Sequence, residues 1–182
     1  MIGGILKKLF GDKGQKDLKE LQPFVEAANV EHAKLGELSN DELRAITPAL
    51  KAKIANGLKE IDAKISELKK KAADANTLID EKEQMFQEIE TLEKESDVVL
   101  EEVLLDILPQ AFAVVKETAK RFTENEKVEV TANDFDKEVD ESRENVEIIG
   151  EKAFWNKTWD ASGTEVIWNM IHYDVQLLGG TA

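Results

Sequence analysis

The longest regular pattern along the chain is a row of apolar residues between positions 58 and 98. Its members recur at alternating steps of three and four residues, the spacing of a heptad seam on one helix face: Leu58, Ile61, Ile65, Leu68, Ala72, Ala75 and Ile79. The seam resumes at Phe86 and Ile89 after Lys82 takes a seam position, and it slips by one residue at Leu92. Charged residues fill the positions between, so residues 58–98 are predicted to form a helical arm.

Two arrangements satisfy this seam. In the first, one long helix forms a coiled coil with a partner chain. In the second, the small residues between Ala72 and Asn76 mark a bend, and the arm folds back as an antiparallel hairpin. We favour the hairpin, because a single chain then buries its own apolar row.

Residues 1–57 have the pattern of N-terminal helices. The first ten residues place one apolar face on a short helix, made of Ile2, Ile5, Leu6, Leu9 and Phe10. This face is either an interfacial membrane anchor or the contact of a terminal helix with its own domain. A second helical pattern follows over residues 16–35. Ser39 then predicts an N-cap, completed as a capping box by Glu42, for a helix that meets Pro48 and runs toward Gly57.

After the arm the period changes. Residues 99–122 predict an apolar core helix, with Pro109 expected to start a new helix. Residues 123–168 contain stretches in which apolar and polar positions alternate, as in strands, and the segment from Asp160 to Gly163 predicts a turn. All three tryptophans lie in residues 155–168 and are expected in the core of a small sheet. The predicted fold class is α+β, mainly α-helical, with a long helical (coiled-coil-like) arm and a small β-containing insertion.

Charge and composition narrow the classes of function. The 182 residues contain no cysteine and carry a net charge of -14. Residues 1–16 hold four lysines against Asp12, a net of +3, which leaves -17 for the remainder. A basic, apolar start on an acidic body suits an anionic membrane surface and argues against nucleic acid as the main partner. No stretch approaches the ~20 apolar residues that span a bilayer, and no signal peptide is recognised, so a soluble, cytoplasmic protein is expected.

Catalytic motifs are nearly absent. The sequence has no GxxxxGK(S/T), HExxH, GxSxG or GxGxxG, and no ligand-type spacing surrounds His32 or His172, so no metal site is predicted. Gln176 is the candidate binding residue, because its amide offers one acceptor and two donors and can bond an adenine edge at two points. Taken alone, a glutamine before Gly179 and Gly180 is better explained as a surface amide.

Four segments, in this order along the chain, resemble the SecA family, the bacterial motor ATPases that drive preproteins through the membrane. The segments are residues 5–11 (ILKKLFG), residues 38–43 (LSNDEL, similar to the family's LSDEEL), residues 108–121 (LPQAFAVVKETAKR, similar to PEAFAVVREASKR) and residues 172–180 (HYDVQLLGG, similar to HFDVQLLGG). The third and fourth are long and specific. Residues 58–98 and 123–168 depart from the shorter family members and resemble insertions found in some bacterial lineages.

The resemblance implies a nucleotide site and a division of the chain. Gln176 is implied to contact the adenine of ATP, with Tyr173 where the family usually has Phe, and with Met170 packed nearby. The implied division is residues 1–57, N-terminal helices; 58–98, the arm insertion; 99–122, the core helix; 123–168, the β-containing insertion; and 169–182, the start of the nucleotide-binding domain.

The resemblance also implies ATP with Mg²⁺ as the cofactor of the full-length protein. The phosphate-binding loop lies further along the family's sequence, so the 182 residues alone are expected to hold no nucleotide and to be inactive as an ATPase. The implied partners are the protein-conducting channel of the inner membrane, preprotein substrates and acidic phospholipid bound by residues 1–16, at the cytoplasmic side of that membrane. A homo-oligomer is compatible with the seam. The alternatives are a non-catalytic helical adaptor that uses the arm and a membrane-surface binding module.

Overall fold

The computed structural model describes residues 19–181, which divide into two compact units. The arm unit is Pro48–Ile107, and the main unit combines Met1–Thr47 with Leu108–Ala182. Helices predominate, and every strand among the described residues lies in the main unit. The predicted fold class, a mainly α-helical α+β fold with a long helical arm, is confirmed.

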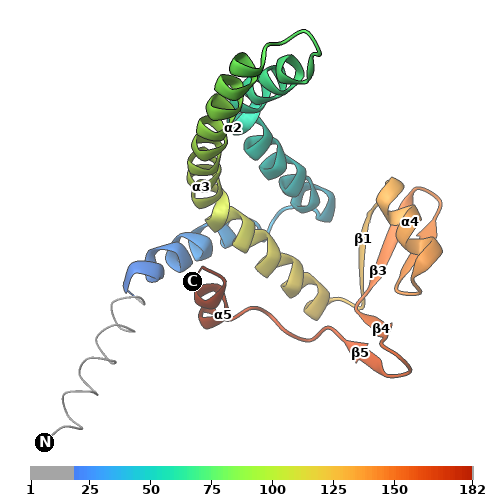
Figure 1. The fold of residues 1–182 in the computed structure, drawn as a ribbon. Helices are drawn as coiled ribbons and strands as arrows, with labels where there is room; N and C mark the ends of the chain where they lie inside the picture. The colour runs from blue at the N-terminus through green and yellow to red at the C-terminus, as the bar shows by residue number, and fades with distance from the viewer. Residues whose placement is uncertain (1–18, 182) are drawn as a thin grey trace, which may run out of the picture. The chain divides into compact units, whose positions relative to one another are not determined.

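The arm unit is a hairpin made from the greater part of two long helices, α2 (Asn40–Ala73) and α3 (Ile79–Glu124). Figure 1 shows the parts of these helices nearest the turn side by side, joined by that short turn. The side chain of Asp74 accepts the Asn76 amide at 2.9 Å, and the Thr77 hydroxyl donates to the Lys71 carbonyl at 2.8 Å, which closes the turn. The arm therefore folds back within its own chain, close to the predicted bend.

The predicted seam holds along α2 and changes its members on α3. From Leu58 to Ala72 every seam residue is buried or half-buried. On α3, Ile79 and Phe86 are 83% and 57% exposed, so their prediction as seam residues is wrong. Ile79 is the first residue of α3, beyond the last turn of α2, and Met85 takes the inward position beside Phe86. Periodicity alone does not show where the partner helix ends.

Ser39 and Glu42 form the predicted capping box at the start of α2. Ser39 donates its backbone N–H to Glu42 Oε2 at 2.8 Å, and Ser39 Oγ accepts the Glu42 amide at 3.2 Å. Pro109, in contrast, does not start a helix but lies inside α3, so that prediction is wrong. Proline removes one helical hydrogen bond, and the buried Ala113 and Val114 show that packing beyond it holds the helix together.

The strands form two small antiparallel sheets. β1 (Lys127–Thr131), β2 (Val146–Ile149) and β3 (Lys152–Asn156) are ordered β1-β3-β2. β4 (Thr158–Asp160) and β5 (Glu165–Ile167) form a hairpin at the predicted turn, where Ser162 and Gly163 have φ of 57° and 85°, as a type I′ turn requires. Between β1 and β2, α4 (Asp134–Ser142) is capped by Asn133.

The core of the main unit joins segments that lie far apart in sequence. One cluster contains Leu35 and Leu43 with Ala113 and Val114 of α3. A second cluster joins the helix through residues 19–32 to α3 and to α5 (Asp174–Thr181), and its members are Val25, Ala28, Phe112, Leu177 and Leu178. Across the described residues, no helix is both long enough and apolar enough to cross a membrane.

Candidate functional site

The candidate site is the first turn of α5 and the segment that leads into it. The helix begins at Asp174, directly after Tyr173, and Gln176 is its third residue. The Tyr173 backbone N–H donates to Gln176 Oε1 at 2.8 Å. A side chain at this position reaches back to the residue before the helix, as in the second half of a capping box. The local sequence therefore sets the conformation of the Gln176 amide.

The same amide lies against Met170. Gln176 Nε2 donates to the thioether sulfur at 3.6 Å. The structure thus brings together all three residues proposed from the sequence, with Gln176 bonded to the backbone of Tyr173 and to the side chain of Met170. All three are exposed, Tyr173 most strongly at 72%.

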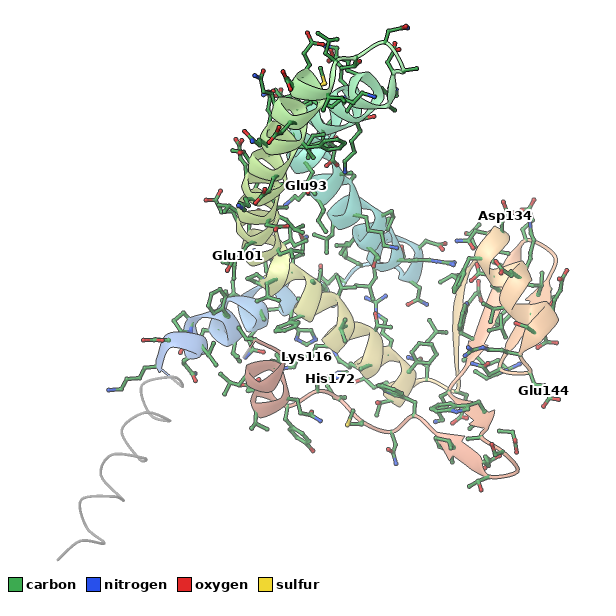
Figure 2. All side chains as sticks on the ribbon, in the orientation of Figure 1. Glu93, Glu101, Lys116, Asp134, Glu144 and His172 are labelled. Atoms are coloured by element: carbon green, nitrogen blue, oxygen red, sulfur yellow. The ribbon has the colours of Figure 1, made fainter. Side chains whose placement is uncertain are left out.

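An ion pair and a hydrogen bond, both to Asp174, fix the start of α5 within the main unit. Asp174 Oδ1 accepts hydrogen bonds from Asn29 Nδ2 and Lys116 Nζ, both at 3.2 Å, and Lys116 also donates to Asn29 Oδ1 at 2.8 Å. The hydrogen bond from Asn29, followed by that from Lys116, lowers the pKa of Asp174 below its ordinary value. Figure 2 labels Lys116 on α3, in the part of the main unit that α5 packs against.

The segment before α5 is held along the last turns of α3. Trp168 Nε1 donates to the Ala119 carbonyl at 3.1 Å, and Thr123 Oγ1 donates to the Met170 carbonyl at 3.3 Å. The His172 ring lies 6.3 Å from that of Trp168. These contacts position Met170 beside Gln176, so α3 supports the candidate site at two places.

A buried polar cluster connects the second and third segments of the family resemblance. Glu117 is only 3% exposed; its Oε1 accepts from Arg121 Nε at 3.0 Å, and its Oε2 lies 3.0 Å from His32 Nε2. Arg121 also donates to Asn40 Oδ1 at 2.8 Å and to the Leu35 carbonyl at 3.0 Å. Glu117 and Arg121 lie within the third segment, and the sequence alone predicts no role for them. Their spacing of four on one helix face was the available signal.

The arrangement is suited to binding. One lone pair of Gln176 Oε1 and one N–H of Nε2 remain available after the contacts with Tyr173 and Met170, which leaves an acceptor and a donor side by side. This pair matches the donor and acceptor on an adenine edge. Within residues 19–181, no group of three or more His, Asp or Glu side chains is arranged to hold a metal ion.

The comparison with family models defines the class of protein. Residues 6–182 match the family described as SecA DEAD-like domain. The chain is 51% identical over 178 residues to the protein translocase subunit SecA of Cytophaga hutchinsonii, and 45% identical over 181 residues to that of Christiangramia forsetii. These alignments cover 97% and 100% of this chain and 16% of each relative.

A third relative, the protein translocase subunit SecA of Bacteroides fragilis, is 43% identical over 175 residues, which are 96% of this chain and 16% of that protein. The chain therefore belongs to the SecA family, and it spans about a sixth of the length of these relatives. No solved structure matches it.

Proposed function

We propose that the chain is the adenine-reading part of an ATP-driven motor that moves preproteins through the membrane channel. In the full-length protein, Gln176 bonds the adenine amine and a ring nitrogen, while Tyr173 and Met170 pack near the base. ATP with Mg²⁺ is the cofactor, and the groups that hold the phosphates belong to other parts of the protein.

The observation that carries this proposal is the position of the Gln176 amide. Its contacts with the Tyr173 N–H and the Met170 sulfur orient an exposed donor and acceptor beside a thioether and an aromatic residue. The Asp174 contacts with Asn29 and Lys116 hold the backbone that carries it. A preorganised amide loses little conformational entropy when a base binds.

The proposal is tested by nucleotide binding to the full-length protein. Gln176→Ala should weaken ATP and ADP binding by about 1–3 kcal/mol, the scale of a bidentate base contact, and should reduce the preference for ATP over GTP. Gln87→Ala is the matched control, since Gln87 is an exposed glutamine on α3 in the arm unit. Unchanged nucleotide affinity and base preference in Gln176→Ala would rule out the role of Gln176.

We propose further that residues 1–16 bind acidic phospholipid at the cytoplasmic face of the inner membrane, next to the protein-conducting channel. These residues lie outside the described ones, and their net charge of +3 and the helical spacing of their apolar positions support the proposal. Each lysine near an anionic surface contributes about 1 kcal/mol. Lys7→Glu with Lys8→Glu should therefore reduce co-sedimentation of the full-length protein with anionic vesicles, whereas Lys51→Glu with Lys53→Glu should not. Equal binding to neutral and anionic vesicles would contradict it.

We also propose a division of the chain into family segments and additions. The family segments are the N-terminal helices in residues 1–57, the core helix in residues 99–122 and the start of the nucleotide-binding domain in residues 169–182. The additions are residues 58–98 and 123–168. The packing of residues 38–43, 108–117 and 172–180 around the two clusters of the main unit supports this division.

A second candidate function for the arm is assembly, as an adaptor surface or in a homo-oligomer. It rests on three exposed apolar residues where the hairpin turns, Leu78, Ile79 and Phe86. Ile79→Glu with Phe86→Glu should lower the mass of the full-length protein in sedimentation if the arm joins copies. If the double variant has the same mass as the parent at every concentration, self-association through the arm is excluded.

A further inference from the structure

The three-stranded sheet has two edges, formed by β1 and β2, which differ in whether their outward backbone groups are hydrogen-bonded. At the β1 edge, side chains from the first turns of α2 bond the outward backbone groups. Asn40 Nδ2 donates to the Glu129 carbonyl at 2.9 Å, and the Thr131 N–H donates to Asp41 Oδ1 at 2.8 Å. Exposed edge groups are a template for pairing with another strand, and here α2 occupies the Glu129 carbonyl and the Thr131 N–H.

At the β2 edge, no side chain of the described residues bonds the outward backbone groups; α4 contacts this strand without a hydrogen bond to them. In an antiparallel sheet, hydrogen-bonded and non-bonded pairs alternate along the strands. Because Glu129 and Thr131 point their backbone groups outward from β1, their partners Phe154 and Lys152 must bond β2 instead, at Glu147 and Ile149.

The bond from the Asn156 N–H to the Asn145 carbonyl, at 2.8 Å, fits this alternation. The N–H and C=O groups of Val146 and Ile148 therefore point away from β3, at the free edge. Within residues 19–181, neither backbone nor side-chain hydrogen bonds reach them.

The surroundings of this free edge are acidic. Residues 133–151 contain eight acids and two bases, a net of -6. The fully buried Asp136 is paired with Arg44, whereas the carboxylates nearest β2 along the chain are exposed: Asp140, Glu141, Glu144, Glu147 and Glu151. Figure 2 labels Asp134, the first residue of α4, and Glu144, which follows that helix. Lys137 pairs with Asp134, and Lys127 pairs with Glu147.

We propose that the free edge of β2 binds an extended, basic segment of a partner polypeptide, which adds a fourth strand to the sheet. The partner's backbone bonds the N–H and C=O groups of Val146 and Ile148, and its Lys or Arg side chains lie along the acids on either side. Ile149 is 56% exposed and offers an apolar contact on the outer face. The inference rests on the sheet and its charges and does not depend on Gln176 or on nucleotide.

The charge near β2 favours a basic segment over three other occupants: a second copy of the chain, nucleic acid and a neutral segment. A second copy of the chain would place Glu147 and its acidic neighbours against the same residues, and like charges across strands are destabilising. Nucleic acid would bring phosphates to the same carboxylates. A neutral extended segment would form the backbone bonds but gain nothing from the five exposed acids.

The first test uses a fluorescent peptide of alternating Lys and Val and the full-length protein. Ile148→Pro removes one outward N–H and keeps the ladder to β3, because proline is tolerated where the N–H of an edge strand faces solvent. Ile148→Ala is the matched control, which loses side-chain volume but keeps that N–H. The proline variant should bind the peptide about tenfold more weakly than the alanine variant, the scale of one to two lost hydrogen bonds. Equally weak peptide binding by the proline and alanine variants would show that no strand pairs at this edge.

The second test varies the peptide, so that it decides even where Ile148→Pro fails to fold. A peptide with alternate backbone amides N-methylated keeps its charges but cannot pair on one side, and an alternating Glu and Val peptide keeps its backbone but reverses the charge. Both should bind at least about tenfold more weakly than the Lys and Val peptide.

Three further outcomes would also overturn the proposal. One is equal binding of the methylated peptide, which would show an electrostatic contact without strand addition. Another is no binding of any peptide by the full-length protein. The third is a concentration-dependent dimer abolished by Ile148→Pro, which would make a second copy the occupant.

Discussion

The Arg44 guanidinium donates two hydrogen bonds to the Asp136 carboxylate, at 2.7 Å to Oδ2 and 2.8 Å to Oδ1, and the carboxylate is completely buried. Arg44 belongs to α2 and Asp136 to α4, so this pair joins the start of a long helix to the β-containing insertion. Asp136 also accepts the Trp155 indole N–H at 3.0 Å and the Asn133 N–H at 2.9 Å. Every lone pair of a buried anion therefore has a donor nearby, which is the condition for a stabilising buried pair.

Replacing Arg44 by Met should destabilise the main unit by about 2–4 kcal/mol, since the carboxylate would stay buried without its cation. Arg44 is 30% exposed, so water replaces part of the interaction. Urea unfolding followed by tryptophan fluorescence measures the change. Lys152→Met, which breaks an exposed pair with Glu129, is the control and should cost about 0–1 kcal/mol. Equal losses in the two variants would show that the Arg44 pair contributes no more than a surface pair.

The same pair makes stability depend on pH in a defined direction. Burial raises the pKa of Asp136, but the hydrogen bonds from Arg44, Asn133 and Trp155 outweigh it, so the pKa lies below its ordinary value of 3.8. A carboxyl with a lowered pKa stabilises the folded state above that ordinary value, and the contribution is lost as the pH falls below it.

Asp136→Asn should therefore be less stable than the parent at neutral pH, and the difference should shrink below pH 3.8. Urea midpoints of the two proteins, measured from neutral pH to about pH 3, give this difference directly. A difference that stays constant across the range would show that the Asp136 charge does not contribute.

Asp174 is expected to act on nucleotide through the position of Gln176. Asp174→Ala removes the acceptor for Asn29 and Lys116 and loosens the first turn of α5. In the full-length protein, ADP affinity should fall by less than in Gln176→Ala, with the preference for adenine over guanine retained. Asp174→Asn should recover part of the loss, because its amide oxygen still accepts from Asn29. A loss of base preference in Asp174→Ala would indicate a direct contact instead.

Gly57 on α2 faces Val103 on α3, within the arm unit. A Cβ at Gly57 would lie 2.9 Å from Val103 Cγ2, closer than side chains approach one another. Gly57→Ala should gain up to about 1 kcal/mol of helix propensity and lose about 1–3 kcal/mol through overpacking, a net destabilisation. Thermal unfolding tests the sign.

A double variant tests whether the contact between Gly57 and Val103 causes this loss of stability. Adding Val103→Ala should offset much of the effect of Gly57→Ala, so that the two changes together cost less than the sum of each alone. Gly179→Ala, with no atom within 4 Å of the new Cβ, is the control without a clash. Strict additivity between positions 57 and 103 would contradict the contact.

Local chemistry alone determined several features of this protein. The capping box of Ser39 and Glu42, the type I′ turn at Ser162 and Gly163, and the seam from Leu58 to Ala72 each depend on residues within a few positions of one another. The order of the four family segments likewise determined the family.

Tertiary structure decided the rest, because periodicity reports which face of an element is apolar and not which element covers it. The pairing of Arg44 with Asp136, the meeting of Asn29, Lys116 and Asp174, and the exposure of Ile79 and Phe86 all depend on where distant elements end and pack. Pro109 stays inside α3 for the same reason, since the packing of Ala113 and Val114 beyond it outweighs the local preference.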